Sequence, residues 1–234
     1  MRNSLQKPTS KSFMADFNLT LFEKEPVLGI IRGIKEDSLT GLLHAAYSGG
    51  IRFLEITLNT PGALLLIKKA VELFPSICIG AGTVLSADAT QQAINSGAQF
   101  IVAPNLNEHV ADVCVKNNRP YFPGALTPTE IEKAWSFGAT MVKVFPAAQM
   151  GPDYIRLLKG PFEQIKLMAV GGITPNNISD YFSAGASAVA LGGSIFSARR
   201  MADKEFSLMQ KEIEEFMFAV NKVYSNMVES AVAK

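Results

Sequence analysis

Eight short apolar segments, rich in β-branched and aromatic residues, recur along this 234-residue chain at nearly even intervals. Successive segments start 20 to 26 residues apart, a spacing that accommodates one strand, one helix and two short loops. The segments are residues 27–33, 53–59, 77–84, 100–105, 121–125, 141–146, 165–172 and 188–194. Helical patterns lie between them, and several end in a glycine just ahead of the next segment. This alternation predicts parallel strands joined by right-handed helical crossovers.

Eight such units favour an α/β fold, a closed (β/α)8 barrel of the TIM type in a single domain. An open doubly wound sheet is the alternative, because a sequence pattern fixes topology only loosely. We expect a flexible segment over residues 1–11 and one barrel domain over residues 12–234, because no linker or shift of composition divides the chain. An amphipathic stretch at residues 12–24 predicts an extra N-terminal helix that caps one end of the barrel, and residues 202–223 predict a closing helix.

The composition argues against several classes of function. Lys and Arg total 22 against 21 for Asp and Glu, so we expect no nucleic-acid partner and no membrane surface as partner. The apolar runs are strand-sized, well short of the roughly 20 residues of a membrane helix, and the N-terminus lacks the pattern of a secretory signal. Neither the two cysteines, Cys78 and Cys114, nor the two histidines have metal-ligand spacing. These features predict a cytoplasmic protein with reduced thiols and no metal site.

One charged residue, Lys143, interrupts the apolar segment at residues 139–148. In a strand, Met141, Lys143 and Phe145 share one face while Val142 and Val144 share the other. If the valines pack against helices, the lysine points into the protein. Burial disfavours an ammonium ion and favours the neutral amine, which can attack a carbonyl and form a Schiff base. The alternative is a lysine that extends from the strand end to solvent.

A carboxylate occupies an equivalent position in the second segment. There Glu55, Thr57 and Asn59 alternate with three aliphatic residues, so the polar side chains are expected to face the barrel interior. A buried carboxylate needs a partner, and Lys143 from another strand is the obvious one. A purely structural ion pair is the alternative, although buried charged pairs are often functional.

Other strand ends carry polar or very small residues, and barrel active sites lie at those ends. Arg32 follows the first strand and offers a fork of donors to a carboxylate. Thr83 follows a run of small residues that lets a ligand approach.

Glycine pairs close the last two strands, as Gly171-Gly172 and as Gly192-Gly193 followed by Ser194. Glycine-rich turns after these two strands are the usual phosphate site of a barrel, because bare backbone N–H groups face the anion there. A tight turn without a ligand is the alternative for either pair alone.

Taken in order, these segments resemble the 2-keto-3-deoxy-6-phosphogluconate (KDPG) and 4-hydroxy-2-oxoglutarate (KHG) aldolase family, class I pyruvate aldolases on a (β/α)8 barrel. The resemblance runs from about residue 27 to residue 196. Its markers are Phe-Leu-Glu-Ile-Thr-Leu at 53–58, Gly-Ala-Gly-Thr-Val-Leu at 80–85, Tyr-Phe-Pro-Gly at 121–124, Val-Lys-Val-Phe-Pro-Ala at 142–147, Lys-Gly-Pro-Phe at 159–162 and Val-Gly-Gly-Ile at 170–173.

The resemblance implies roles for individual residues. Lys143 would be the Schiff-base lysine, Glu55 the general acid and base, and Thr83 a ligand of the pyruvate carboxylate. The other substrate contacts that it implies are Gly171, Gly172, Gly193 and Ser194 around the phosphate, with Pro104 and Phe145 lining the pocket.

The chain departs from the family pattern at one position. Many members carry arginine where this chain has Asn59, so Arg32 is expected to hold the pyruvate carboxylate, with Asn59 as a further candidate contact. The segments Leu-Asn-Thr-Pro at 58–61 and Met-Gly-Pro-Asp-Tyr-Ile at 150–155 resemble the sister 2-keto-3-deoxy-6-phosphogalactonate aldolases. The preferred epimer at C-4 therefore stays open.

The resemblance predicts a class I aldolase that cleaves 2-keto-3-deoxy-6-phosphogluconate to pyruvate and glyceraldehyde 3-phosphate, with neither a metal nor an organic cofactor. Its partner would be a small phosphorylated 2-keto sugar acid, and the family suggests a homotrimer. The galactonate isomer and 4-hydroxy-2-oxoglutarate, which yields pyruvate plus glyoxylate, are alternative substrates. A phosphosugar epimerase or isomerase and a non-catalytic phosphate-binding barrel are alternatives of other classes, because fold alone does not fix function.

Overall fold

The computed structural model of the protein describes the backbone of residues 17–232 and the side chains of residues 17–223. The segment predicted to be flexible, residues 1–11, lies outside the described residues, as do the first five residues of the predicted N-terminal stretch. No helix among the described residues is long and apolar enough to cross a membrane.

The strands form one parallel sheet in the order β5-β4-β3-β2-β1-β9-β8-β7-β6. They are β1 (Val27–Ile31), β2 (Phe53–Thr57), β3 (Cys78–Gly82), β4 (Ile101–Val102), β5 (Tyr121–Phe122), β6 (Gly124–Ala125), β7 (Val142–Val144), β8 (Leu167–Val170) and β9 (Ala188–Leu191). The two ends of this order, β5 and β6, are halves of one predicted strand that Pro123 divides. Because these halves are consecutive in the chain, the sheet closes on itself, and the predicted barrel is confirmed.

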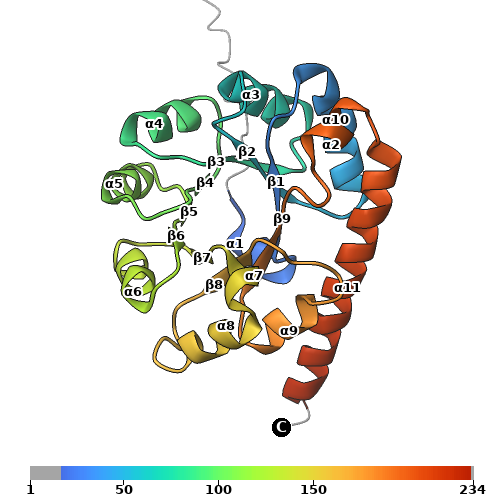
Figure 1. Ribbon diagram of the computed structural model, residues 1–234. Helices are drawn as coiled ribbons and strands as arrows, with labels where there is room; N and C mark the ends of the chain where they lie inside the picture. The colour runs from blue at the N-terminus through green and yellow to red at the C-terminus, as the bar shows by residue number, and fades with distance from the viewer. Residues whose placement is uncertain (1–16, 233–234) are drawn as a thin grey trace, which may run out of the picture.

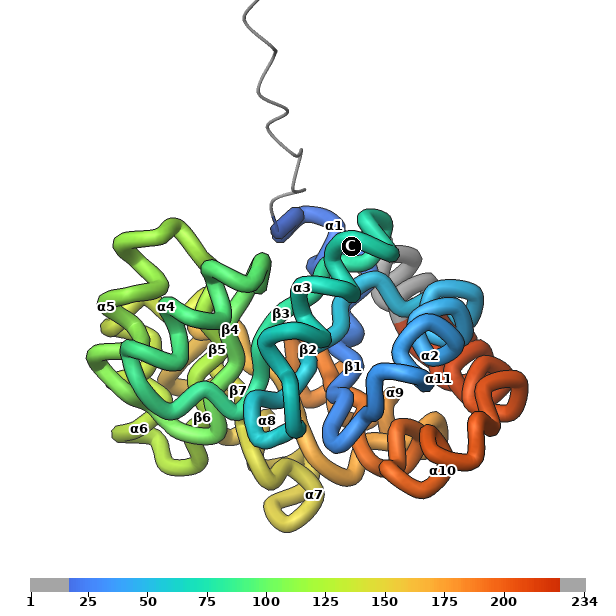
Figure 2. The backbone as a smooth tube through the Cα atoms, turned by 90° about the horizontal axis from the view of Figure 1, so that it is seen from above, coloured from blue at the N-terminus to red at the C-terminus, as the bar shows by residue number. Residues whose placement is uncertain are grey.

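Helices surround this barrel and cover its ends, as Figure 1 shows. They are α1 (Leu19–Lys24), α2 (Glu36–Ser48), α3 (Ala63–Leu73), α4 (Ala87–Asn95), α5 (Glu108–Lys116), α6 (Pro128–Ser136), α7 (Ala147–Met150), α8 (Pro152–Lys159), α9 (Ile178–Ser183), α10 (Ala198–Ala202) and α11 (Phe206–Val232). Figure 2 places α1 at one end of the barrel, with α7 and α10 at the opposite end.

The strands divide the core into two layers. Val142, Val144 and Leu54 belong to the layer between strands and helices, whereas Phe53 and Met141 belong to the layer inside the barrel. A side chain that alternates with the valines of β7 therefore points inward. This arrangement confirms the predicted orientation of Lys143.

Interlocked phenylalanine rings close the end of the barrel where α1 lies. Asn18 caps α1 by accepting a hydrogen bond of 2.9 Å from the backbone N–H of Leu21, and Phe22 on that helix is buried. The ring of Phe22 lies 4.8 Å from that of Phe53 and 5.7 Å from that of Phe122, between centroids. The expected capping helix is therefore present, and its helical part begins at Leu19.

The predicted closing helix begins later than expected. Residues 198–202 form the separate helix α10. Lys204, with φ of 56°, interrupts the helical conformation before α11 starts at Phe206. A left-handed backbone conformation cannot continue an α-helix, and the periodicity of apolar residues gave no sign of it.

Candidate active site

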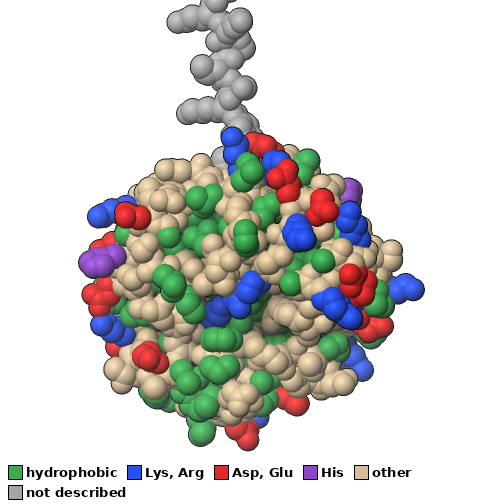
Figure 3. Space-filling view, turned by 45° about the horizontal axis from the view of Figure 1, so that its top comes forward, with side chains coloured by type: hydrophobic (Ala, Val, Ile, Leu, Met, Phe, Trp, Pro, Cys, Tyr) green, Lys and Arg blue, Asp and Glu red, His purple; other side chains and the backbone are tan. Residues whose placement is uncertain are grey.

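A cavity of about 490 Å³ opens where the strands end. Its lining residues lie on β1, β7 and β8 or in the loops that follow β1, β3, β4, β7, β8 and β9: Ile30, Arg32, Thr83, Pro104, Lys143, Phe145, Val170, Gly171, Gly172, Ile173, Thr174, Gly192, Gly193, Ser194 and Phe196. All the predicted site residues except Glu55 and Asn59 are among them. On the face seen in Figure 3, Lys and Arg side chains gather near the middle, beside hydrophobic ones.

Lys143 brings an amine to this cavity from inside the barrel. Its side chain extends from the middle residue of β7, between Gly124 on β6 and Met168 on β8, and only 8% of the residue is exposed. Its Nζ lies 5.4 Å from the centroid of the Phe145 ring. Among the described residues no carboxylate forms an ion pair with it. The amine is thus buried, unpaired and open to a ligand in the cavity.

Glu55 lies deeper, and only 1% of it is exposed. Burial raises the pKa of its carboxyl group above the ordinary 4.5, an effect that the charges of Lys143 and Arg32 partly oppose. One carboxyl oxygen, Oε2, has no hydrogen-bond partner. Glu55 is therefore a carboxyl group biased toward its protonated form, with an oxygen free to exchange a proton.

The predicted contact between Glu55 and Lys143 is electrostatic rather than direct. Each side chain faces the barrel interior, and the lysine charge acts on the carboxyl group, yet no ion pair joins them within the described part of the chain. A proton that passes between them requires a bridging group, such as water or a substrate oxygen.

The Glu55 carboxyl group packs directly against the backbone of Gly82. A Cβ added to Gly82 would lie only 2.2 Å from Glu55 Oε1. A side chain at this position is therefore incompatible with the observed place of the carboxyl. Gly82 was not among the residues predicted for the site, although the Gly-Ala-Gly run at 80–82 is a signal of close approach.

Thr83 lines the cavity in a strained conformation, with φ of 55°. This left-handed region is unfavourable for a β-branched residue, and such strain costs about 1–3 kcal/mol. Its neighbours are fixed, because the N–H of Val84 donates to Val102 O and the N–H of Leu58 donates to Gly82 O. Because these hydrogen bonds maintain the strain at the cavity wall, a functional role for Thr83 is supported.

Arg32 is exposed at the cavity wall, and its turn is anchored to the end of β2. The N–H of Gly33 donates a 2.8 Å hydrogen bond to Thr60 Oγ1, which lies 3.2 Å from Thr57 Oγ1. Both threonines are buried. Arg32 has no ion-pair partner among the residues with described side chains, so its guanidinium is available to an anion. Thr60 was missed from the sequence, which carried no signal for it.

Asn59 does not line the cavity and is exposed. The alternation that predicted an inward side chain stops at Thr57, the last residue of β2. The N–H of Thr60 then donates to Thr57 O, so the chain turns at Asn59, and strand geometry no longer applies to it.

Two glycine turns form the remaining rim. Gly171 and Gly172 have φ of 97° and 77°, and a Cβ on Gly172 would lie 2.4 Å from Ala148 Cβ. The turn after β9 contributes Gly193 and Ser194. Within the described chain, the N–H groups of Gly172, Gly193 and Ser194 donate to no backbone acceptor. They are available to an anion, as expected of a phosphate site.

The apolar part of the lining was not predicted either, namely Ile30, Val170, Ile173 and Phe196. Such residues look the same in sequence whether they pack in a core or face a ligand. No group of three or more His, Cys, Asp or Glu side chains in the described chain is placed to hold a metal ion.

Comparison with known proteins agrees with this geometry. Residues 20–211 match the family model described as KDPG and KHG aldolase. The 2-dehydro-3-deoxy-phosphogluconate aldolase of Treponema pallidum (strain Nichols) is 34% identical over 194 residues, which are 81% of this chain and 92% of that protein.

Solved structures show the same similarity. One described as "Native KDPGal structure" superposes with a TM-score of 0.80 at 31% identity, covering 86% of this chain and 96% of the other. The KDPG aldolase of Legionella pneumophila, which holds pyruvate captured as a covalent carbinolamine intermediate, has a TM-score of 0.77 at 28% identity, covering 83% and 95%.

Proposed function

Since the chain belongs to the KDPG and KHG aldolase family of carbon–carbon lyases, we propose that it cleaves 2-keto-3-deoxy-6-phosphogluconate through a Schiff base at Lys143. The products are pyruvate and glyceraldehyde 3-phosphate. The single observation that carries the proposal is the buried, unpaired amine of Lys143 at a cavity that also contains free anion-binding groups.

The first steps form the imine. The Lys143 amine, in its unprotonated form, adds to the C-2 ketone of the substrate and gives a carbinolamine. Loss of water from that adduct leaves an iminium ion, and Glu55 supplies the proton that the departing hydroxyl requires. The raised pKa of Glu55 suits this role, because it favours the protonated carboxyl group that can donate to the departing hydroxyl.

The next steps break and remake bonds at C-3. The iminium ion withdraws the electron pair of the C3–C4 bond while the C-4 hydroxyl gives its proton, through a bridging water, to the Glu55 carboxylate, which releases glyceraldehyde 3-phosphate and leaves an enamine. Glu55, acting through a bridging water, returns a proton to C-3. Hydrolysis of the resulting iminium ion frees pyruvate and restores the amine.

Groups that can bind an anion lie around the cavity and support binding of a substrate with an anion at each end. Arg32 offers a charge-assisted fork, and Thr83 a hydroxyl, to the carboxylate beside the ketone. The free N–H groups of the two glycine turns suit the phosphate at the other end. In this arrangement Pro104 and Phe145 line the pocket.

The galactonate isomer is the second candidate substrate. The similarity to the structure described as KDPGal favours it, because the TM-score there is 0.80. The two sugar acids differ only in the configuration at C-4, between the reacting carbonyl and the phosphate.

A cleavage assay with both phosphorylated isomers and 4-hydroxy-2-oxoglutarate tests the proposal. The highest kcat/KM with the gluconate isomer supports it, and the highest value with either other compound reassigns the substrate. Turnover of none of the three would refute the proposed reaction.

The resemblance also supports a homotrimer in the cytoplasm. Light scattering of the purified protein tests the assembly, and a monomer mass would exclude the trimer. Fractionation of the source cells tests the location.

A further inference from the structure

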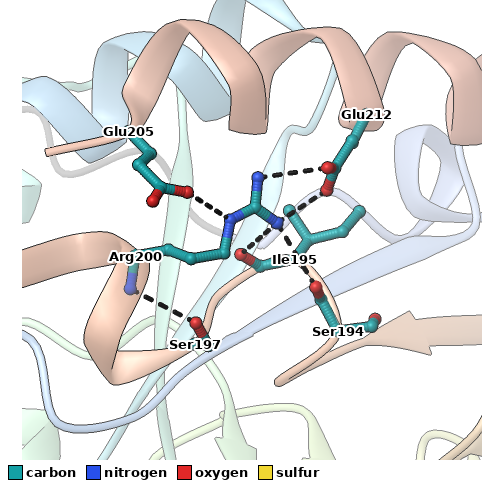
Figure 4. A network of polar contacts seen from close by, with 6 residues as sticks. All are labelled: Ser194, Ile195, Ser197, Arg200, Glu205 and Glu212. Carbon is teal, nitrogen blue, oxygen red and sulfur yellow. Dashed lines mark hydrogen bonds and ion pairs between the residues drawn. The ribbon is translucent and has the colours of Figure 1, made fainter. Parts of the chain in front are cut away.

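Arg200 on helix α10 joins the glycine turn after β9 to helix α11, as Figure 4 shows. Its Nη1 and Nη2 donate to the two carboxyl oxygens of Glu212, at 2.7 and 3.1 Å. Its Nε donates to Glu205 Oε2 at 3.0 Å. The same Nη1 lies 3.4 Å from the carbonyl oxygens of both Ser194 and Ile195. One side chain thus connects three segments of the fold.

These contacts hold two consecutive peptide groups from both sides. The carbonyl oxygens of Ser194 and Ile195 accept from Arg200, whereas the N–H groups of the same two peptides, those of Ile195 and Phe196, donate to Gly192 O. A peptide group fixed at both its C=O and its N–H cannot rotate without losing a hydrogen bond. The turn is therefore fixed immediately after Gly193 and Ser194.

Arg200 itself does not face the cavity. Only 12% of its side chain is exposed, and it is absent from the cavity lining. Hydrogen bonds and ion pairs with Glu212 and Glu205 raise the pKa of its guanidinium. Its charge is thus compensated by two carboxylates, and its effect on a ligand must pass through the turn that it holds.

We propose that Arg200 is a positioning residue for anion binding, because it holds the turn so that the free N–H groups of Gly193 and Ser194 stay directed at the cavity. The ligand class is a phosphate ester or inorganic phosphate. This inference rests on the proposed function, in which that turn binds the substrate phosphate.

The role predicts an effect confined to one end of the cavity. Lys143 lies on β7 and Arg200 follows β9, so imine formation with pyruvate, which carries no phosphate, should not depend on Arg200. A residue that serves only general stability would instead alter pyruvate and phosphate binding together.

The test compares Arg200→Lys with the triple variant R200M/E205Q/E212Q. Lysine retains the charge but lacks the planar fork, and the triple variant leaves neither of the two half-buried carboxylates charged without its partner. Arg199→Met is the matched control, since Arg199 is the neighbouring, exposed arginine of the same helix. Two measurements are made on each protein: inorganic phosphate binding by phosphorus NMR, and the rate of pyruvate trapping by borohydride.

We expect both Arg200 variants to bind phosphate at least about tenfold more weakly, as for loss of one charge-assisted hydrogen bond. Trapping should stay within about twofold of the parent in every variant, and Arg199→Met should match the parent in both measurements. Phosphate affinity unchanged in the Arg200 variants, or a parallel fall in trapping, would overturn the inference. A parent protein that binds no phosphate would overturn it as well, while trapping reports separately on the imine chemistry of the proposed function.

Discussion

The Glu55 carboxyl rests on the bare backbone of Gly82, so that a single carbon added to Gly82 would come within 2.2 Å of Glu55 Oε1. The clash involves the end of a flexible side chain rather than backbone, and the φ of Gly82 is not in the left-handed region. An alanine there can therefore be accommodated by moving Glu55 away.

Gly82→Ala should consequently lower activity much more than stability. If Glu55 is the proton carrier, its displacement should reduce kcat by about 10²-fold or more, with a small change in melting temperature. Gly160→Ala is the control, because a Cβ there meets its nearest neighbour at 3.4 Å. Near-normal kcat in Gly82→Ala would show that the position of Glu55 is not critical.

Replacing Glu55 by glutamine should change how stability depends on pH. The pKa of Glu55 is raised in the folded protein by burial, so above pH 4.5 the unfolded chain loses a proton that the folded protein still holds. Stability then falls as pH rises toward the folded pKa, with a slope of up to about 1.4 kcal/mol per pH unit, and the full penalty persists at higher pH.

Glu55→Gln removes that penalty, since the amide does not ionise. Urea unfolding across the pH range should show the variant gaining on the parent as pH increases, with little difference below pH 4.5, where Glu55 is protonated in both states. Cleavage should meanwhile slow by about 10²–10⁴-fold. A stability difference that is constant with pH would contradict the raised pKa.

Relief of the backbone strain at Thr83 should raise stability and lower activity. Asparagine tolerates the left-handed region, so Thr83→Asn should raise the free energy of unfolding by about 1 kcal/mol while weakening substrate binding. Thr83→Val retains the strain and shape without the hydroxyl. It should raise KM with no gain in stability, and an unchanged KM in Thr83→Val would exclude the hydroxyl as a ligand.

Arg32 and Asn59 can be separated by substitution. Arg32→Met should raise KM for the 2-keto acid by about 10- to 100-fold, as for loss of a charge-assisted hydrogen bond. Asn59→Ala should leave KM nearly unchanged, because Asn59 is exposed outside the cavity. These KM values are measured by steady-state kinetics. A larger rise in KM for Asn59→Ala than for Arg32→Met would instead place the carboxylate site at Asn59, after the end of β2.

The sequence predicted the site wherever regular strand geometry applied. Lys143 and Glu55 lie within β7 and β2, where side chains alternate strictly, so their inward orientation followed from the residue order. Asn59 lies two residues beyond the end of β2, and the same rule failed there because a turn had begun.

Features made by tertiary contact were beyond reach of the sequence. Arg200 on α10 contacts Glu212 on α11 although the two residues lie 12 positions apart in the sequence (Figure 4), and the positive φ of Lys204 between these helices breaks no pattern of apolar residues. The contact between Gly82 and Glu55 is an intermediate case. The glycine is visible in the sequence, but the sequence does not show which side chain packs against it.

A second lysine, Lys159, provides an internal comparison for imine formation at Lys143. Burial lowers the pKa of Lys159, but its Nζ donates to three backbone carbonyls, those of Phe162, Glu163 and Ile165. It lies outside the cavity lining, and its donors are occupied. Lys143 alone of these two lysines is placed for imine formation.

The most direct measurement is peptide mass spectrometry of the protein after incubation with pyruvate and borohydride. We predict one reduced pyruvyl group, located on Lys143 and absent from Lys143→Ala, which should also lose all cleavage activity. Unmodified protein, or an adduct on Lys159 in place of Lys143, would contradict the account.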